Sequence, residues 1–298
     1  MIEKARPLSR TGKVADYIPA LKEADPNLVA CSVFTKEGAC HRFGDVGTTF
    51  TIQSVSKTLT LALAIMDHGE EEVFKRVGME PTGDPYYSMA RLELTRQAKP
   101  LNPMINAGAL AITSMIKGRT VEERCERILS FVQAVAGDTS IRINQEVAHS
   151  EYETTDKNRA LAFYLKGEGI IDDDIDDLIR VYTQQCSIEV SCCHLARIGL
   201  IMGTRGYAMD EQRQIIPKEV AKLVKTFMVT CGMYNSSGEL AIKSGIPAKS
   251  GVSGAILGSL PQGVGIGIYS PPLDEKGNSK VGIELLKNLS QKYDLSIF

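Results

Sequence analysis

The sequence lacks the features of a membrane-spanning or polyanion-binding protein. It has no uninterrupted run of about eighteen apolar residues, the length that a membrane-spanning helix requires. Its net charge is −2 and its pI is about 6.2, so no positive excess favours nucleic acid or an anionic membrane. The N-terminal residues contain no apolar h-region, and we therefore expect no signal peptide and a cytoplasmic location.

Cysteines and histidines are few and scattered. The seven cysteines are odd in number and lack the spacing of a disulfide framework, so we expect reduced thiols. We expect the adjacent Cys192 and Cys193 to be small apolar residues within a helix rather than a redox pair. No C-x-x-C or H-E-x-x-H motif occurs, which argues against a metal site. The histidines are His41, His68, His149 and His194.

Two kinds of hydrophobic pattern divide the chain. Strand-like segments lie near both ends, whereas helical periodicity dominates the middle. With 43% hydrophobic residues the chain can bury a substantial core. The pattern predicts an α/β (α+β) fold with a mixed antiparallel sheet from both chain ends and flanking helices. We expect residues 1–80 and 235–298 to form this sheet-containing lobe, and residues 81–234 to form an inserted helical lobe.

Individual elements follow from local composition. We expect residues 12–19 to form the beginning of an N-terminal helical segment, and a meander of strands to lead to residue 54. Its strands are 28–34, 39–44 and 48–52. In the middle we expect helices over 121–135, 159–165, 175–184, 192–202 and 218–227. After residue 234 we expect one strand over 248–258, a returning strand over 264–269 and a closing helix over 281–293.

Ser54 and Lys57 lie where the strand over 48–52 runs into an apolar helical segment over 59–66. Residues three apart are neighbours on a helix, so the hydroxyl and the amine can meet. S-x-x-K is the signature of serine enzymes that transfer acyl groups, in which a base must remove the serine proton. An ordinary lysine is neutral in about one molecule in a thousand near pH 7.4, but burial at a helix N-terminus lowers its pKa.

Simpler interpretations of these residues stand beside the catalytic one. S-x-x-K occurs by chance in many chains, and a serine at the start of a helix is commonly an N-cap. The sequence does not exclude a Ser-His-carboxylate triad, although no histidine lies in a recognisable nucleophile elbow.

A second motif, Lys249-Ser250-Gly251, lies on the expected late strand. K-[ST]-G is the partner of S-x-x-K in penicillin-recognising enzymes. A glycine in the strand lets a ligand approach the backbone, and free N–H groups can bind an oxyanion. However, the chain has no S-x-N or Y-x-N motif, and this absence argues against a β-lactamase or transpeptidase. The two motifs together favour a serine acyl-enzyme.

Longer strings extend these motifs from about Gly12 to the C-terminus. They are 12–19, 53–57, 102–109, 186–190, 231–234, 247–252 and 270–274. In order and spacing they resemble the signatures of the serine-dependent glutaminase family. The resemblance implies a β-lactamase/transpeptidase-like fold and hydrolysis of L-glutamine to L-glutamate and ammonia. It also implies that no metal or organic cofactor is used.

The resemblance assigns catalytic roles residue by residue. Ser54 becomes the nucleophile and Lys57 its base. The backbone N–H groups of Ser54 and Val252 become the oxyanion hole. Tyr182 and Tyr234 are placed near the serine, where they hold the substrate and help to move protons. The supporting strand residues are Lys249, Ser250 and Gly251.

The same resemblance assigns Tyr17, Asn106, Glu151 and Asn158 to the two ends of glutamine. The residue types suit a zwitterion, because a carboxylate accepts from the ammonium, and amides and hydroxyls donate to the carboxylate. Taken alone, Asn106 is typical of a turn and Asn158 of a polar helix position. Ser54, Tyr182, Tyr234 and Val252 complete the expected substrate contacts.

Three residues depart from the family pattern: Tyr87 replaces the usual asparagine, Thr155 the usual glycine and Lys157 the usual arginine. They change the surroundings of Glu151 and Asn158 but remove no assigned residue. A β-lactamase-like acyl transferase and a non-catalytic amino-acid sensor are the alternatives to a glutaminase. The resemblance further implies a homo-oligomer, a tetramer or a dimer, with no nucleic-acid or membrane partner.

Overall fold

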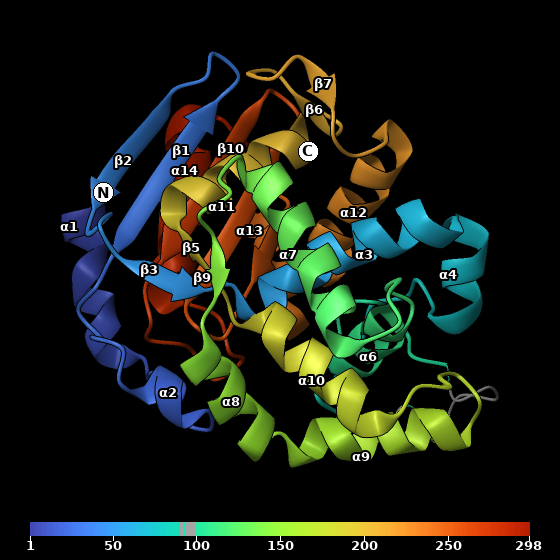
Figure 1. The fold of residues 1–298 in the computed structure, drawn as a ribbon. Coiled ribbons are helices and arrows are strands. Elements are labelled where there is room, and N and C mark those ends of the chain that lie inside the picture. Colours follow the sequence, from blue (N-terminus) through green and yellow to red (C-terminus); the bar gives the residue numbers. More distant parts are fainter. Residues whose placement is uncertain (90–91, 93–98) are drawn as a thin grey trace.

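A five-stranded antiparallel sheet is the centre of the computed structural model, which describes residues 1–89, 92 and 99–298. The strand order is β2-β1-β10-β9-β8, so strands from the two chain ends lie side by side, as Figure 1 shows. The predicted mixed sheet built from both chain ends is therefore confirmed. The strands are β1 (Ala30–Thr35), β2 (Cys40–Gly44), β8 (Ala248–Ser250), β9 (Ala255–Leu260) and β10 (Val264–Tyr269).

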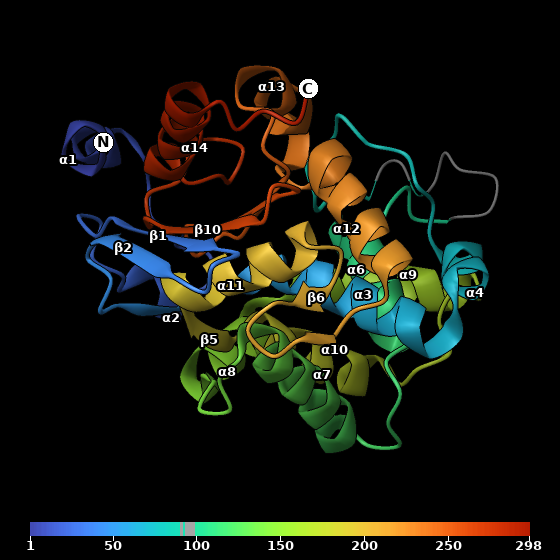
Figure 2. The ribbon, with the colours of Figure 1, turned by 90° about the horizontal axis from the view of Figure 1, so that it is seen from above.

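Helices cover both faces of this sheet, which is seen edge-on in Figure 2. One face carries α14 (Lys280–Tyr293), with α13 (Ser237–Lys243) and α1 (Ile2–Ala5) nearby. Leu285 and Leu286 of α14 pack there against Ile266 and Ile268 of β10. The opposite face is covered by α11 (Cys192–Gly203), which packs mainly against β10, β9 and β1. Because strand side chains alternate between faces, the sheet separates two apolar cores.

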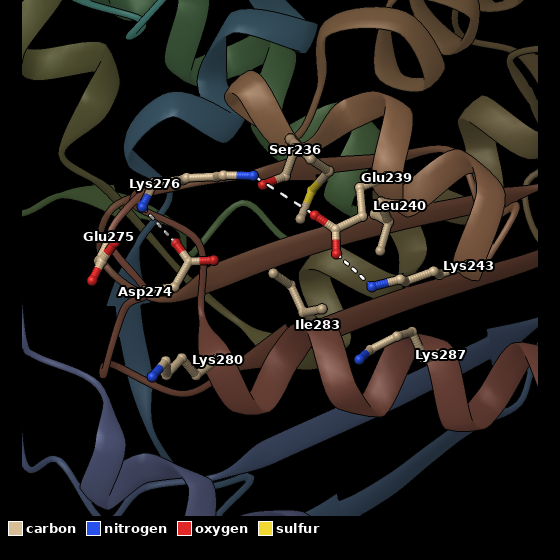
Figure 3. Close-up of a pocket in the computed structure, with 11 residues that line it drawn as sticks. Ser236, Glu239, Leu240, Lys243, Asp274, Glu275, Lys276, Lys280, Ile283 and Lys287 are labelled. Atoms are coloured by element: carbon tan, nitrogen blue, oxygen red, sulfur yellow. Dashed lines mark hydrogen bonds and ion pairs between the residues drawn. The ribbon is translucent and has the colours of Figure 1, made fainter.

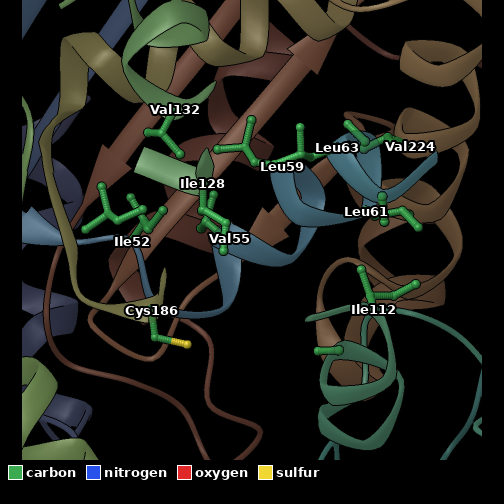
Figure 4. Close-up of a cluster of buried hydrophobic side chains, with 14 of the residues drawn as sticks. Ile52, Val55, Leu59, Leu61, Leu63, Ile112, Ile128, Val132, Cys186 and Val224 are labelled. Carbon is green, nitrogen blue, oxygen red and sulfur yellow. The ribbon is translucent and has the colours of Figure 1, made fainter. Parts of the chain in front are cut away.

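The larger core is centred on α3 (Ser56–His68), the predicted apolar helix after Ser54. Figure 4 shows Leu59, Leu61 and Leu63 of α3 among side chains from four other helices. Those neighbouring helices are α6 (Asn106–Ser114), α7 (Val121–Ala136), α10 (Ile175–Cys186) and α12 (Lys218–Cys231). The remaining α-helices of the described ranges are α2 (Pro19–Lys22), α4 (Glu70–Arg76), α8 (Gln145–Thr154) and α9 (Asp156–Gly167).

Short strands correct the predicted meander. β3 (Thr49–Thr51) leaves the main sheet and pairs with β5 (Ile188–Ser191), which also pairs with β4 (Arg142–Ile143). The meander prediction was wrong here because the partner of β3 lies about 140 residues away, beyond any local pattern. β6 (Tyr207–Ala208) and β7 (Arg213–Gln214) form a separate hairpin.

Two further element predictions were wrong. The segment 12–18 is not helical, since Lys13 exchanges backbone hydrogen bonds with Leu273; the helices there are the short η1 (Arg6–Thr11) and α2. The segment 248–258 is a hairpin rather than one strand. Gly254 has a φ of 98°, which closes the turn between β8 and β9.

The expectation of uniformly reduced thiols was wrong for one pair. Cys40 of β2 and Cys193 of α11 form a disulfide with a Cα–Cα distance of 6.3 Å. Their separation of 153 residues left no local trace in the sequence. The other cysteines, including Cys192, are free and buried, as expected for small apolar residues.

Within the described ranges, no helix combines the length and the apolar character that crossing a bilayer requires. Among those same residues, no group of three or more His, Cys, Asp or Glu side chains is arranged to hold a metal ion. The division into lobes over 1–80 with 235–298 and over 81–234 stays a prediction.

Candidate active site

Ser54 is held at the junction between β3 and α3, within the 3-10 turn η2 (Gln53–Val55). The backbone of Gln53 has a φ of 45°, a left-handed conformation that is unusual for a residue other than glycine. Such backbone outliers are maintained only where the surroundings enforce them, and they concentrate at functional sites. Ser54 is 7% exposed and lines a cavity, so its hydroxyl is accessible there although it lies deep in the fold.

Lys57 lies beneath the serine in the first turn of α3 and is 1% exposed. Its Nζ donates to Asn106 Oδ1 at 2.7 Å and to the Met104 carbonyl at 3.3 Å. Burial lowers the pKa of Lys57 to about 8, although the Cys186 and Glu151 side chains oppose this shift. A neutral amine has two N–H donors and one lone pair. The two acceptors present satisfy both donors and leave the lone pair free.

A chain of amides extends from Lys57 to the helical layer. Asn106 Nδ2 donates to Asn158 Oδ1 at 2.9 Å, and Asn158 Nδ2 donates to Thr155 Oγ1 at 2.7 Å. All four side chains are buried. The departure at Thr155 therefore supplies a hydroxyl acceptor that glycine would not have. Because each amide both accepts and donates, the chain fixes the orientation of Asn106 and Asn158.

Glu151 of α8 is a buried carboxyl group beside this chain. Burial raises the pKa of Glu151 to about 7, against the opposing effects of the Gln53 side chain and of Lys57. Its Oε2 atom has no hydrogen-bond partner among the described residues. An unpaired buried carboxylate oxygen is costly, and a cationic ligand would compensate it.

Four tyrosines surround the serine from different elements. Burial raises the pKa of both Tyr182 and Tyr234 well above the ordinary value, so both hydroxyls stay protonated. The Tyr234 hydroxyl interacts with the Ser54 side chain and donates to the Ser250 carbonyl at 3.3 Å. The Tyr86 ring packs at a tilt against that of Tyr234, with centroids 4.5 Å apart, and the Tyr86 hydroxyl is 3.4 Å from that of Tyr17.

The end of β8 brings a backbone N–H group to the serine. A Cβ atom at Gly251 would lie 2.7 Å from the Ile52 carbonyl oxygen, so only glycine allows this approach without a shift. Neither the Val252 N–H nor the Ser54 N–H has a hydrogen-bond partner among the described residues. Both N–H groups therefore remain free to donate to a ligand in the cavity that Ser54 and Val252 line.

Lys249 supports this strand end from within the core. It is fully buried, and burial together with the neighbouring Lys57 lowers its pKa well below the ordinary value. Its Nζ donates to the Ser250 carbonyl at 2.6 Å and lies 4.7 Å from the centroid of the Tyr234 ring. The Ser250 hydroxyl is buried and has no partner among the described residues. Lys249 thus holds the strand and the tyrosine together.

A single cavity of about 460 Å³ collects most of the predicted site. Its lining includes the predicted residues Tyr17, Ser54, Asn106, Glu151, Asn158, Tyr182 and Val252. Tyr234 contacts Ser54 from behind the lining, whereas Lys57 and Lys249 lie deeper. One part of the prediction differs in geometry: Lys57 is hydrogen-bonded to Asn106 and Met104, and the described structure has no direct Ser54–Lys57 hydrogen bond.

Sequence reasoning gave no catalytic or binding role to nine residues that line the cavity, although three of them had been named as departures from the family pattern. The nine are Ile18, Gln53, Tyr86, Tyr87, Thr154, Thr155, Asp156, Lys157 and Cys186. Gln53 and Cys186 lie within the segments that resemble the family, but no motif around either residue indicates a particular chemistry. Lys157 Nζ lies 4.6 Å from the centroid of the Tyr87 ring, so two of the departures from the family pattern contact each other at the cavity.

A second cavity, of about 340 Å³, lies between α13 and α14 and is drawn in Figure 3. It contains several lysines, but Glu239 accepts ion pairs from both Lys243 and Lys276. Lys280 donates to the Thr11 carbonyl, and Lys287 pairs with Glu284. Because the amino groups of these lysines are already engaged, the cavity offers less reactive chemistry than the one around Ser54.

Known proteins resemble this chain over its whole length. The sequence model of the glutaminase family matches residues 12–298. A glutaminase of Geobacillus thermodenitrificans is 55% identical over 297 residues, covering 100% of this chain and 96% of the relative. Glutaminase 2 of Bacillus subtilis is 50% identical over 298 residues, with the same coverage.

Solved structures agree with the sequence relatives. A Bacillus glutaminase crystallised in 4.3 M NaCl has a TM-score of 0.93 and 42% identity, covering 100% of this chain and 97% of that chain. A probable glutaminase from Bacillus subtilis, complexed with 6-diazo-5-oxo-L-norleucine, has a TM-score of 0.92 and 40% identity, covering 100% and 94%. The predicted β-lactamase-like fold is confirmed, and the chain belongs to the glutaminase family of hydrolases.

Proposed function

We propose that this chain hydrolyses L-glutamine to L-glutamate and ammonia through a γ-glutamyl ester on Ser54. The observation that carries the proposal is a fully buried lysine, Lys57, one helical turn after Ser54, whose two N–H donors are already engaged by Asn106 and Met104. Support also comes from a relative: a Bacillus subtilis glutaminase forms a covalent complex with 5-oxo-L-norleucine after reaction with 6-diazo-5-oxo-L-norleucine. That reagent has the shape of glutamine with a reactive group at its amide end.

In the first step, Ser54 Oγ attacks the γ-amide carbon and its proton passes to neutral Lys57, directly or through the Tyr234 hydroxyl. The Ser54 and Val252 N–H groups stabilise the negative charge that develops on the amide oxygen. One such donor commonly contributes about 3 kcal/mol to transition-state stabilisation. Lys57 then returns the proton to the amide nitrogen, the C–N bond breaks and ammonia leaves.

In the second step, water attacks the ester carbonyl and Lys57 again accepts the proton. The oxyanion forms in the same place, so both N–H groups serve twice. The collapse of this intermediate returns the proton to Ser54 Oγ and releases glutamate. Because each step moves one proton out and one back, the lysine must exchange protons readily near neutral pH, which a pKa of about 8 permits.

The other residues that line the cavity are proposed to bind the α-ammonium and α-carboxylate groups of the substrate. The unpaired Oε2 of Glu151 accepts from the α-ammonium, and the charge of the ligand favours the ionised carboxylate. The amides of Asn106 and Asn158 and the hydroxyls of Tyr17 and Tyr182 supply polar groups for the α-carboxylate. Recognition at both ends favours the free amino acid over glutamine within a peptide.

The test compares Ser54→Ala with Ser130→Ala, a control at an exposed position of α7. Glutamate release is measured in a coupled assay, and glutamine binding is measured by calorimetry. We expect Ser54→Ala to lose turnover by about four orders of magnitude or more, while binding is retained. We also expect the diazo ketone to modify Ser54 in the parent protein. Near-normal turnover in Ser54→Ala, or an adduct on another residue, would falsify the assignment.

The coupled assay also separates the alternatives. An amino-acid sensor would bind glutamine without releasing glutamate, and a β-lactamase-like acyl transferase would hydrolyse a chromogenic β-lactam. A homo-oligomer, tetramer or dimer, and a cytoplasmic location stay predictions. Light scattering on the purified protein measures the oligomeric state.

A further inference from the structure

The disulfide between Cys40 and Cys193 lies outside the cavity of the proposed active site. Cys40 is the first residue of the edge strand β2, and Cys193 lies in the first turn of α11. Both residues are only partly buried, whereas the five other cysteines are buried. Cys40 and Cys193 are therefore the two cysteines that a soluble reagent reaches most easily.

The surroundings of Cys193 stabilise a thiolate. The Arg42 guanidinium is 3.8 Å from Cys193 Sγ, and no carboxylate of a described residue lies within 4.0 Å of Arg42 to compensate its charge. The N-terminus of α11, a helix of 12 residues, adds its partial positive charge at the same sulfur. Cationic groups and helix N-termini are the features that make a cysteine reactive.

A cavity of about 370 Å³ gives access to this sulfur. Cys193, Arg42 and His194 line it, together with Ser32 of β1. The Ser32 hydroxyl is fully buried and has no hydrogen-bond partner among the described residues. Asp138 and Asp210 also line the cavity, but Asp138 pairs with His194 and Asp210 with Arg197, which leaves the Arg42 guanidinium beside the sulfur.

We propose that Cys40 and Cys193 form a reversible thiol–disulfide site, which a dithiol reductant opens and in which Cys193 is the reactive thiol. A reductant thiolate attacks Cys40 Sγ, the S–S bond breaks, and Cys193 leaves as a thiolate. The second reductant thiol then attacks the mixed disulfide and releases Cys40. Two electrons and two protons pass from the dithiol to the protein, and the reductant becomes its own disulfide. The better-stabilised thiolate is the faster leaving group, which favours attack at Cys40.

The site is connected to the segments that position the nucleophile. The chain leads from Cys40 through β2 and β3 to Ser54, and Cys193 lies two residues after the end of β5. β3 and β5 are paired, and the Ile52 N–H donates to the Ile188 carbonyl at 2.9 Å. A closed disulfide ties both segments together at their outer ends. Reduction removes this cross-link and lowers the resistance of the fold to heat.

The first test counts thiols in the denatured full-length protein and maps the linked peptide by mass spectrometry. After mild oxidation we expect five free thiols and a linkage between Cys40 and Cys193. After treatment with dithiothreitol we expect seven. We also expect reduction to lower Tm by on the order of 5 °C, because the bond closes a long loop. The Cys40→Ser/Cys193→Ser variant should have the lower Tm with or without reductant.

The second test measures alkylation of the reduced, folded protein by iodoacetamide at pH 7. Cys193 should react several-fold faster than Cys40, and Arg42→Gln should slow it several-fold. Arg119→Gln, at an exposed position remote from this site, should leave the rate unchanged. Seven free thiols after oxidation, or a reductant-independent Tm, would overturn the disulfide. Equal alkylation of Cys193 in parent and Arg42→Gln would overturn its role as the reactive thiol.

Discussion

Raising the pH from 6 to 9 should increase kcat/KM for glutamine in two overlapping steps. The proposed mechanism requires neutral Lys57 and, to hold the substrate ammonium, ionised Glu151. Burial raises the pKa of Glu151 to about 7 and lowers the pKa of Lys57 to about 8. Below pH 7 both groups are mostly in the wrong protonation state, and above pH 8 both are mostly in the right one. The profile should therefore rise most steeply below pH 7 and level off above about pH 8.5.

The size of the effect follows from these two pKa values. At pH 7.4 about one lysine in five is neutral, compared with about one in a thousand for an ordinary lysine. At pH 6 the product of the two active fractions is about one in a thousand, and at pH 9 it is about nine in ten. We therefore expect kcat/KM to rise about a thousand-fold across this range.

Glu151→Gln isolates the two contributions. The variant should bind glutamine weakly, but its kcat/KM should rise by at most about a hundred-fold from pH 6 to 9. Its remaining step should lie at a lower pH than that of the parent, because the Glu151 charge raises the Lys57 pKa. Circular dichroism at each pH checks that the fold persists. A flat profile, or a single step near pH 10.5, would refute a neutral, buried lysine as the base.

Three substitutions test the surrounding geometry by steady-state kinetics. Tyr234→Phe keeps the ring but removes the hydroxyl beside the nucleophile, and should lower kcat by about a hundred-fold. Thr155→Val leaves the buried Asn158 amide without its acceptor; this costs about 1–3 kcal/mol and should raise KM more than it lowers kcat. Gly251→Ala forces a methyl group against the Ile52 carbonyl and should lower kcat by about a hundred-fold through the displaced oxyanion donor. Unchanged kcat in Tyr234→Phe or Gly251→Ala, or unchanged KM in Thr155→Val, would contradict the corresponding role.

Local pattern predicted the elements whose stability depends on their own side chains. The hairpin of β1 and β2, the apolar helix α3 and the closing helix α14 all have strong periodicity, and each was expected within a few residues. The predictions failed where a distant partner decides the structure. β3 pairs with β5, and the segment around Lys13 pairs with Leu273, so in both cases tertiary contacts override local propensity.

The residues of the candidate site likewise fall into those that local motifs predict and those that depend on distant contacts. Ser54, Lys57 and Lys249 to Gly251 belong to short motifs whose spacing has a chemical meaning. Asn106 and Asn158 have no such spacing, and they entered the prediction only through family resemblance. Their hydrogen-bonded contact across 52 residues is a property of how α6 meets α9. Cys40 and Cys193, which the family resemblance does not assign, were missed entirely.

Two fully buried lysines close to one serine raise the question of which one is the base. Burial, and to a smaller extent Lys57, lower the pKa of Lys249 well below its ordinary value, which disfavours the charged form. Its Nζ is also engaged by the Ser250 carbonyl at 2.6 Å. Lys57, with a pKa of about 8, can hold a proton transiently and release it near neutral pH. A charge on Lys57 further disfavours one on Lys249. Burial first, and the charge of Lys57 second, disfavour a proton on Lys249. We therefore propose that Lys249 is a positioning residue that holds Tyr234 and the strand end in place.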